Sequence, residues 1–470
     1  MKKIIVVFVC LIVFINHTVA QNWTAMSMGV PFSVYAIYGD EEEGLFYVGG
    51  GYSTQGCLAV YDGTSWNNLN WDSNDWPIYS ITKFKNEVYV CGGFEYADET
   101  YCHLIAKWNG VQWDTVTTLI DGGNIFLGGT KGLFATDSFL YLTGTFNYVG
   151  NVYSPGIIKY DGAQWIAIGN FEGTFPGGAN VNGFNCAAIY NNELYVGGDY
   201  EDSTGHTERI AKFDGVNWSN LGQGINGGFA GVVDLQVYKN ELYAAGTFTK
   251  AEGDPGDFIA KWNGSSWSEV GSGMAGYNAT NNNGQIHDLI VYNDDLYACG
   301  VFHYAGGVSA FHIAKWNGSQ WCGFGDTLDN VCVALGSLNG DLYMGGGFEV
   351  ISTNSIETGD SINHIAKWIG GNYVDTCSVP VTINEIVEND FYFSLYPNFS
   401  NGTLNIIYNT KEDCLLTLYD INGKQVATVS LFHYFKNRLL NVSELPPGVY
   451  LAAVSCKGEK VWSEKVVVQH

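Results

Sequence analysis

The sequence is short of positive charge. It has 21 Lys and Arg residues against 47 Asp and Glu residues, which gives a formal net charge of −26. If the amino-terminal segment with Lys2 and Lys3 is removed, as argued below, 19 basic residues remain and the net charge becomes −28. Such a surface repels phosphate backbones and anionic lipids. The composition therefore argues against a nucleic-acid partner.

Common catalytic and metal-binding motifs are also missing. The chain has no Gly-x-Ser-x-Gly, His-Glu-x-x-His, EF-hand loop, Cys-x-x-Cys or zinc-spaced Cys/His cluster. His312 and His364 precede equivalent short strands, but Arg209 and Phe258 occupy the same position in other repeats. We therefore expect the two histidines to be strand-end residues, with a metal-binding role as the alternative. These absences favour a non-enzymatic protein and predict no cofactor.

Only one long hydrophobic run occurs, and it lies at the amino terminus. Met1 to Ala20 combines Lys2-Lys3, the apolar stretch Ile4 to Ile15 and Thr18-Val19-Ala20. This pattern predicts a secretory signal peptide over residues 1–20, cleaved between Ala20 and Gln21. No other run is long enough to span a bilayer, so no transmembrane segment is predicted in the mature chain.

A repeated cassette dominates the region from Trp23 to Tyr373. Each of seven copies has a tyrosine, a glycine three residues later and an aromatic residue five residues later. The tyrosines are Tyr47, Tyr89, Tyr141, Tyr195, Tyr243, Tyr297 and Tyr343. Their spacing of 42 to 54 residues is typical of a four-stranded propeller blade with its loops.

The cassette divides into four expected strands. In one copy these are Leu289–Val291, Leu296–Gly300, Ile313–Trp316 and a strand that begins near Trp321. In six copies Asn-Gly or Asp-Gly separates the third strand from the fourth, which is a hairpin signal. No helical periodicity appears. The pattern predicts an all-β chain with a seven-bladed β-propeller over residues 21–378.

The amino-terminal end of this region suggests how the ring closes. Trp23 to Gly29 has the pattern of a fourth strand although no first three strands precede it. We expect this strand to complete the last blade, so that no long edge is left unpaired. The combination Leu-Tyr-x-x-Gly-x-Phe and Lys-Trp-Asn-Gly-x-x-Trp resembles kelch and galactose-oxidase-type propellers. That resemblance implies the fold and does not imply one activity.

The carboxy-terminal part has a different character. After the expected linker 379–389, residues 390–470 contain Tyr396-Pro397-Asn398, Leu418 to Lys424 and Leu445 to Leu451. Short strands with Asn-Gly and Pro-Gly turns predict a small Ig-like β-sandwich. The order of these motifs resembles the carboxy-terminal sorting domain of the type IX secretion system of Bacteroidetes, although Phe399 replaces a second proline. The resemblance implies handling by that secretion machinery, followed by release or attachment at the cell surface. An ordinary adhesive sandwich module is the alternative.

Export permits disulfide bonds among the cysteines. Cys414 and Cys456 lie on expected strands of the sandwich and could pair. Cys91 with Cys102, and Cys322 with Cys377, are weaker candidates.

Two groups of residues are candidates for ligand binding. Trp71 and Trp76 are the two propeller tryptophans outside the repeat pattern, and Asp72 and Asp75 flank them in one of the long loops. Indole faces beside carboxylates suit sugar rings, but packing of the loop onto its own blade is an equal alternative.

Asp234 and Asp288 share a first-strand position near the expected central channel, with His287 beside the latter. They could hold a cation or form a solvated channel lining.

The loops between blades and between the second and third strands of a blade are long and varied, whereas the turns expected on the opposite face are tight in all but one case. Variable loops on a rigid scaffold are where binding usually occurs. These observations predict an exported protein, secreted or at the outer-membrane surface, that binds a glycan or protein through this long-loop face. A polysaccharide-active or oxidative enzyme that uses Asp72, Asp75, Asp234 or Asp288 is the first alternative. A passive structural surface protein is the second.

Overall fold

A computed structural model describes the chain over most of its length. The described residues are 23–51, 57–69, 71, 77–117, 120–121, 129–169, 181–200, 209–222, 224–227, 231–251, 257–276, 284–324, 327–352, 360–370, 392–396, 399–400, 403–410, 412–421, 423–431, 437–443 and 445–468. Regular structure in them consists of β-strands. The expected signal peptide and the expected linker lie outside the described residues.

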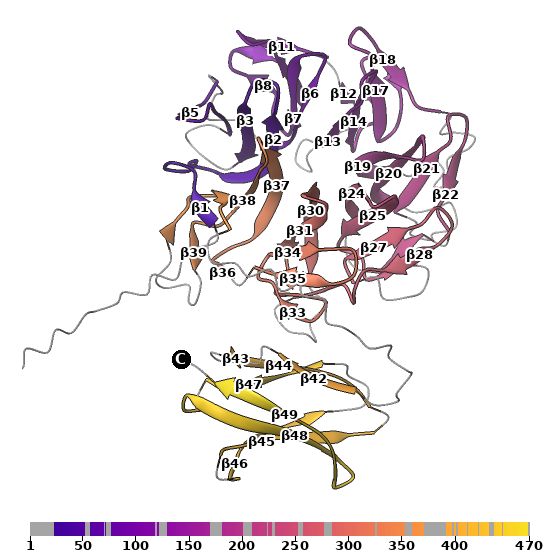
Figure 1. Cartoon of the computed structure of the whole chain (residues 1–470). Coiled ribbons are helices and arrows are strands. Elements are labelled where there is room, and N and C mark those ends of the chain that lie inside the picture. Colours follow the sequence, from indigo (N-terminus) through magenta and orange to yellow (C-terminus); the bar gives the residue numbers. More distant parts are fainter. Residues whose placement is uncertain are drawn as a thin grey trace, which may run out of the picture.

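Seven four-stranded antiparallel sheets form the blades of a propeller (Figure 1). The innermost strands are β2 (Ser33–Asp40), β6 (Ile78–Phe84), β13 (Thr130–Ala135), β19 (Val181–Tyr190), β24 (Val232–Tyr238), β30 (Gln285–Tyr292) and β37 (Cys332–Leu338). The second strands are β3 (Leu45–Gly51), β7 (Glu87–Gly92), β14 (Leu140–Gly144), β20 (Glu193–Tyr200), β25 (Glu241–Gly246), β31 (Asp295–Val301) and β38 (Asp341–Gly346). The third strands are β4 (Leu58–Tyr61), β10 (Ile105–Trp108), β17 (Ile157–Tyr160), β21 (Ile210–Phe213), β27 (Ile259–Trp262), β34 (Ile313–Trp316) and β41 (Ile365–Trp368). The outermost strands are β5 (Trp66–Asn67), β11 (Trp113–Thr115), β18 (Trp165–Ala167), β22 (Trp218–Asn220), β28 (Trp267–Glu269), β35 (Trp321–Gly323) and β1 (Trp23–Ala25).

The ring closes through the amino-terminal strand. β1 pairs antiparallel with β41, so that Trp23 lies opposite Trp368. The innermost strands contact one another around the whole circle, including β2 against β37. The prediction that the first strand completes the last blade is confirmed.

The recurring glycine of each second strand allows close backbone approach. A Cβ atom on Gly50, Gly92, Gly144, Gly198, Gly246, Gly300 or Gly346 would lie only 1.8 to 2.3 Å from a carbonyl oxygen of the adjoining innermost strand or the residue before it. No real Cβ atom tolerates such a distance, so only glycine fits the position.

The fourth-strand tryptophan links neighbouring blades. Its ring packs against the last aromatic residue of the third strand, with centroids 4.9 to 5.3 Å apart in all seven blades. In five blades its indole N–H also donates to a carbonyl oxygen just after the fourth strand of the preceding blade. These donors are Trp66, Trp113, Trp218, Trp267 and Trp321.

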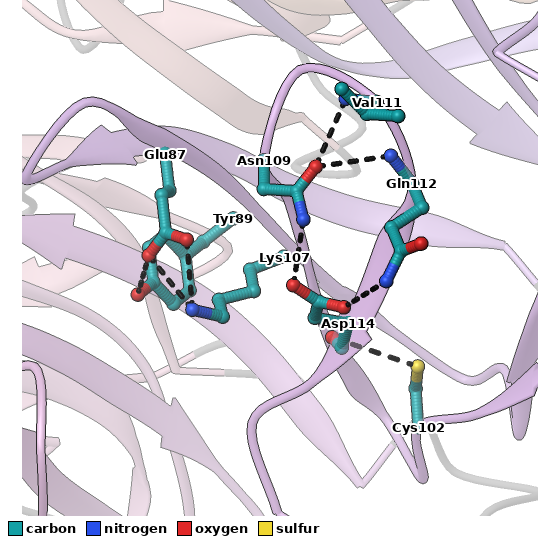
Figure 2. Close-up of polar contacts among 8 residues, drawn as sticks. All are labelled: Glu87, Tyr89, Cys102, Lys107, Asn109, Val111, Gln112 and Asp114. Atoms are coloured by element: carbon teal, nitrogen blue, oxygen red, sulfur yellow. Dashed lines mark hydrogen bonds and ion pairs between the residues drawn. The ribbon is translucent and has the colours of Figure 1, made fainter.

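The recurring third-strand lysine is structural in five blades. Lys107 Nζ lies 2.8 and 2.9 Å from the two carboxylate oxygens of Glu87, which begins the second strand (Figure 2). Equivalent ion pairs join Lys212 to Glu193, Lys261 to Glu241, Lys315 to Asp295 and Lys367 to Asp341. We number the blades 1 to 7 in chain order of their innermost strands, from β2 to β37. In blade 3, Phe139 replaces the acid and Lys159 Nζ lies 4.2 Å from its ring centroid.

The hairpin between third and fourth strands is a four-residue loop rather than a two-residue turn. Trp108 pairs with Trp113, and the Asn109 side-chain oxygen accepts hydrogen bonds from the N–H groups of Val111 and Gln112 (Figure 2). Gly110 takes a φ of +94°, which favours glycine at this position.

Small secondary sheets cover the face where the long loops emerge. Loops between blades contribute β12 (Ile120–Asp121), β23 (Ile225–Asn226), β29 (Met274–Ala275) and β36 (Thr327–Leu328). These strands pair with loop strands of the following blade, namely β15 (Tyr148–Val149), β26 (Lys250–Ala251), β32 (Tyr304–Ala305) and β39 (Val350–Ser352). β16 (Val152–Tyr153), β33 (Val308–Ser309) and β40 (Asp360–Ser361) complete three of the sheets, while β8 (Tyr96–Ala97) and β9 (Thr100–Tyr101) form a separate hairpin.

The carboxy-terminal region forms a β-sandwich. One sheet contains β42 (Tyr392–Tyr396), β44 (Thr403–Asn409) and β47 (Asn437–Asn441). The other contains β43 (Phe399–Ser400), β49 (Glu459–Val468), β48 (Gly448–Cys456), β45 (Cys414–Tyr419) and β46 (Gln425–Leu431). Residues such as Ile406 and Val454 from the two sheets share one buried core.

Cysteine pairing is partly described. Cys414 and Cys456 form a disulfide bond between β45 and β48, with Cα atoms 4.3 Å apart. Cys91 and Cys102 are free and buried, so the candidate bond between them is wrong. Cys322 is disulfide-bonded, and its suggested partner Cys377 lies outside the described residues.

Candidate binding site at the long-loop end of the central channel

A β-bulge interrupts every innermost strand at the same place, close to the end that follows the long loop. The extra residues are Tyr35, Tyr79, Lys131, Asn185, Val233, His287 and Val333. All seven line a channel cavity of about 690 Å³. A bulge re-aims the side chain it carries, so the seven blades together present one ring of side chains to the cavity. We call this ring the bulge tier.

Blades 1 to 3 give the bulge tier an aromatic and cationic side. The rings of Tyr35 and Tyr79 are stacked, with an interplanar angle of 18° and centroids 6.4 Å apart. Lys131 Nζ lies 4.9 Å from the Tyr79 centroid. Burial lowers the pKa of Lys131, because desolvation disfavours its ammonium form.

Where the residue after a bulge has a side-chain oxygen, that oxygen accepts a hydrogen bond from a backbone N–H of the next blade and so joins the two blades. Asp234 accepts a hydrogen bond from Leu289 N–H in the next blade at 2.9 Å, and Asp288 accepts one from Leu335 N–H at 2.6 Å. Ser80 likewise accepts from Leu133 N–H at 3.1 Å. The two aspartates therefore hold the innermost strands together as well as lining the cavity.

The two carboxyl groups also act on each other. Both are partly open to the channel, yet protein surrounds them, and burial raises the pKa of Asp234. Burial raises the pKa of Asp288 well above its ordinary value, and the neighbouring Asp234 carboxylate raises it further. Two carboxyls in contact disfavour double ionisation, so this pair favours a shared proton.

His287 is held in its neutral form. Burial, assisted by the nearby His312, lowers the pKa of His287 to about 4. Its Nδ1 lies 3.3 Å from Gln285 Nε2. At neutral pH this imidazole offers hydrogen bonds but no charge.

The predicted channel residues Asp234, Asp288 and His287 are thus brought together in one cavity. Within the described residues, no group of three His, Cys, Asp or Glu side chains has the arrangement of a metal site. Because the carboxyl oxygens already accept backbone N–H groups, we place no cation between them.

Trp71 does not form the predicted sugar platform. Its side chain is only 3% exposed and packs edge-on against Phe94 and Trp113, each with centroids 4.9 Å away. The structure therefore corrects the binding role proposed for Trp71: its ring packs the loop onto the blade that follows, which is the packing alternative rather than the sugar platform. Trp76, Asp72 and Asp75 lie outside the described residues.

The histidines that precede third strands have a backbone role shared by other residue types. The carbonyl oxygens of His312 and His364 accept hydrogen bonds from Gly300 and Gly346, each at 3.0 Å. Arg209 and Phe258 accept equivalent bonds from Gly198 and Gly246. The position is thus defined by its carbonyl group, as the mixed residue types suggest.

Sequence reasoning missed Tyr35, Tyr79, Lys131 and Asn185. The available signal was the alignment of the repeats, since each stands where His287 stands in its own copy. Their chemical diversity concealed the shared position.

Residues 394–469 match the family model of the secretion system C-terminal sorting domain. This sandwich is a sorting domain. It directs the chain to export by type IX secretion, to the cell surface or the medium. No helix in the described part of the chain is both long and apolar enough to cross a bilayer.

Solved structures with a similar fold have low sequence identity. The extracellular domain of a one-component system from B. thetaiotaomicron is 11% identical, with a TM-score of 0.46 over 96% of this chain and 58% of that chain. A corresponding domain of a hybrid two-component system from the same organism is 11% identical, with a TM-score of 0.47 over 95% and 57%. The GH74 enzyme of Niastella koreensis is 12% identical, with a TM-score of 0.32 over 90% and 75%. The chain thus spans less than two thirds of the first two, and no curated protein matches it.

Proposed function

We propose that this exported propeller is a non-enzymatic binding protein that takes a saccharide at the long-loop end of its central channel. The cavity of about 690 Å³ lies within the usual range for a small ligand and is too small for a folded protein. Its lining combines two tyrosine faces with the amide of Asn185, the imidazole of His287 and the Asp234–Asp288 pair. Sugars need both apolar faces for their C–H groups and polar partners for their hydroxyls.

The observation that carries this proposal is the bulge tier. Seven equivalent bulges aim side chains of five residue types (Tyr, Lys, Asn, Val and His) at one cavity, whereas positions that only stabilise the blades keep nearly the same residue in every repeat. Side-chain diversity on a rigid repeated backbone is what a specific binding site requires.

Binding of the mature protein to a saccharide array, followed by calorimetry of the best ligands, tests the proposal. Tyr79→Ala removes a ring from the cavity and is expected to weaken binding at least about tenfold. Val216→Ala, at an exposed turn, should leave binding unchanged. Unchanged affinity in Tyr79→Ala, or no saccharide bound at all, would contradict the proposal; the latter result fits a passive structural protein.

A polysaccharide-active enzyme is the second candidate, favoured by the two adjacent carboxyls with raised pKa values. Such a pair can serve acid–base chemistry. Turnover of a bound polysaccharide that is lost in Asp288→Asn would establish it, and intact recovery of the ligand after long incubation would exclude it.

A further inference from the structure

Lysines in the described propeller generally have an oxygen partner. Besides the five third-strand ion pairs, Lys83 Nζ lies 2.8 Å from Asp40, and Lys85 and Lys239 donate to the carbonyl oxygens of Asp161 and Asn317. Lys131 and Lys159 differ, since each ammonium contacts an aromatic ring and no carboxylate among the described residues. Of these two, only Lys131 lines the channel cavity.

The other described residues that line the cavity do not neutralise the charge of the Lys131 ammonium group. Apart from the phenols of Tyr35 and Tyr79 and the buried Cys186 thiol, the cavity's other titratable groups within the described residues are His287, Asp234 and Asp288. His287 is neutral. The aspartate pair, which shares a proton, lies on blades 5 and 6 and is not among the groups that raise the pKa of Lys131 on blade 3. Among the described residues, the Cys91 thiol alone counteracts the desolvation that lowers the pKa of Lys131. A partly buried ammonium without an anion is costly, and an anionic ligand would repay that cost.

We infer that the ligand is an acidic saccharide, whose carboxylate binds Lys131 Nζ while the C–H face of the sugar ring lies against Tyr79 and Tyr35. This inference rests on the proposed function and narrows its ligand class to uronic acids and sugars of the same chemistry. The row Tyr35, Tyr79, Lys131 runs over three consecutive blades, so it places an apolar surface beside a cation. A charge-assisted hydrogen bond to a carboxylate is stronger than a neutral one, which makes the acidic group the main determinant of specificity.

Oligomers of galacturonic, glucuronic and mannuronic acid, each compared with its methyl ester, test the inference by calorimetry on the mature full-length protein. Esterification keeps the ring and removes the charge. We expect at least one acid to bind, and its ester to bind at least about tenfold more weakly.

Two variants assign that difference to Lys131. Lys131→Met should remove the preference for the acid over its ester, whereas Lys131→Arg, which keeps the charge, should retain it. Lys159→Met is the matched control, because it removes another ring-contacting lysine from the same blade but outside the cavity. The thermal unfolding midpoint of each variant shows that it is folded.

The outcomes separate this inference from the proposed function. Equal affinity for acid and ester, or an unaltered preference in Lys131→Met, overturns the acidic ligand but leaves a neutral saccharide. If no acidic saccharide binds while a neutral saccharide does, the acidic ligand is likewise overturned and the proposed saccharide binding is kept. Failure of all saccharides contradicts the proposed function itself.

Discussion

Tryptophans in equivalent positions do not all make the same contacts. Trp321 donates its indole N–H to the Val270 carbonyl oxygen at 2.8 Å, whereas the buried indole N–H of Trp23 has no hydrogen-bond partner among the described residues. Both side chains are almost fully buried, at 3% and 0% exposure. Substituting these two tryptophans in turn therefore distinguishes the stability contributed by the interblade hydrogen bond from that contributed by packing of the ring.

Trp321→Phe is expected to lower the free energy of unfolding more than Trp23→Phe does. Both substitutions remove the same ring volume, but only the first deprives a carbonyl oxygen of its donor, at a cost of about 1–3 kcal/mol. Trp23→Phe also removes a buried donor that has no partner in the described part of the chain, which offsets part of its cost. Urea unfolding of both variants measures the difference, and equal losses would show that the indole bond contributes nothing.

Asp288 makes stability depend on pH. Because its folded pKa is raised, the unfolded chain releases this proton from about pH 4 while the folded chain keeps it, so stability falls as pH rises through that window. Asp288→Asn cannot ionise and keeps an oxygen for Leu335 N–H. We expect the stability of the variant relative to the wild type to increase from pH 4 upward, by about 1.4 kcal/mol per unit of pKa shift.

Comparing Asp288→Asn with the wild type cancels the contribution of His287 to the pH dependence of stability, which has the opposite sign to that of Asp288. The pKa of His287 is lowered to about 4, so its effect on stability rises from pH 4 to about 6.5 in both proteins. Unfolding free energies in urea at several pH values provide the measurement. Parallel curves for variant and wild type would contradict a raised pKa at Asp288.

At the level of the strand, two adjacent glycines in and after β38 have different environments. A Cβ atom on Gly346 would lie 2.1 Å from the Val331 oxygen, whereas one on Gly347 would first meet the flexible Asn330 side chain at 3.3 Å. Neither residue has a positive φ, so sterics alone distinguish them.

Gly346→Ala should destabilise the propeller by about 1–3 kcal/mol or more, because two strands must separate to admit the methyl group. Gly347→Ala should change stability little. Thermal unfolding midpoints of the two variants test this, and similar midpoints would mean that the strands adjust without cost.

A strand could be predicted from the sequence where neighbouring residues, such as a short apolar run followed by a turn, define it. The third strand Ile313–Trp316 is found with its predicted bounds, because a short apolar run and a turn define it. The first strand extends beyond Leu289–Val291 to Gln285–Tyr292, since its polar beginning faces the channel. The two-residue strands on the long-loop face, such as β12, carry no periodicity and depend on a partner in the next blade. For the same reason the burial of Trp71 follows from Phe94 and Trp113, which are distant in sequence.

On the scale of the whole molecule, the propeller and the sorting domain have separate cores. A chain that ends at Ser378 should fold into the ring, because all the paired blade strands lie before residue 370. It should nevertheless remain in the periplasm of its native host. Fractionation with the full-length protein as control tests this, and normal surface delivery of the truncated chain would show that the carboxy-terminal domain is dispensable for export.

The pairing of β1 with β41 also sets an order of events in time. It joins residues separated by nearly the whole propeller, and contacts so distant in sequence form slowly. During synthesis and translocation from the amino terminus, β1 emerges first but can pair only after β41, with Trp368, has emerged. The last sheet is complete only then. The sorting domain follows β41 in the chain, so its signal emerges only after every strand of the ring. A nascent chain that still lacks its last blade therefore also lacks the sorting domain. As a result, only chains that already contain every strand of the propeller can be recognised for export.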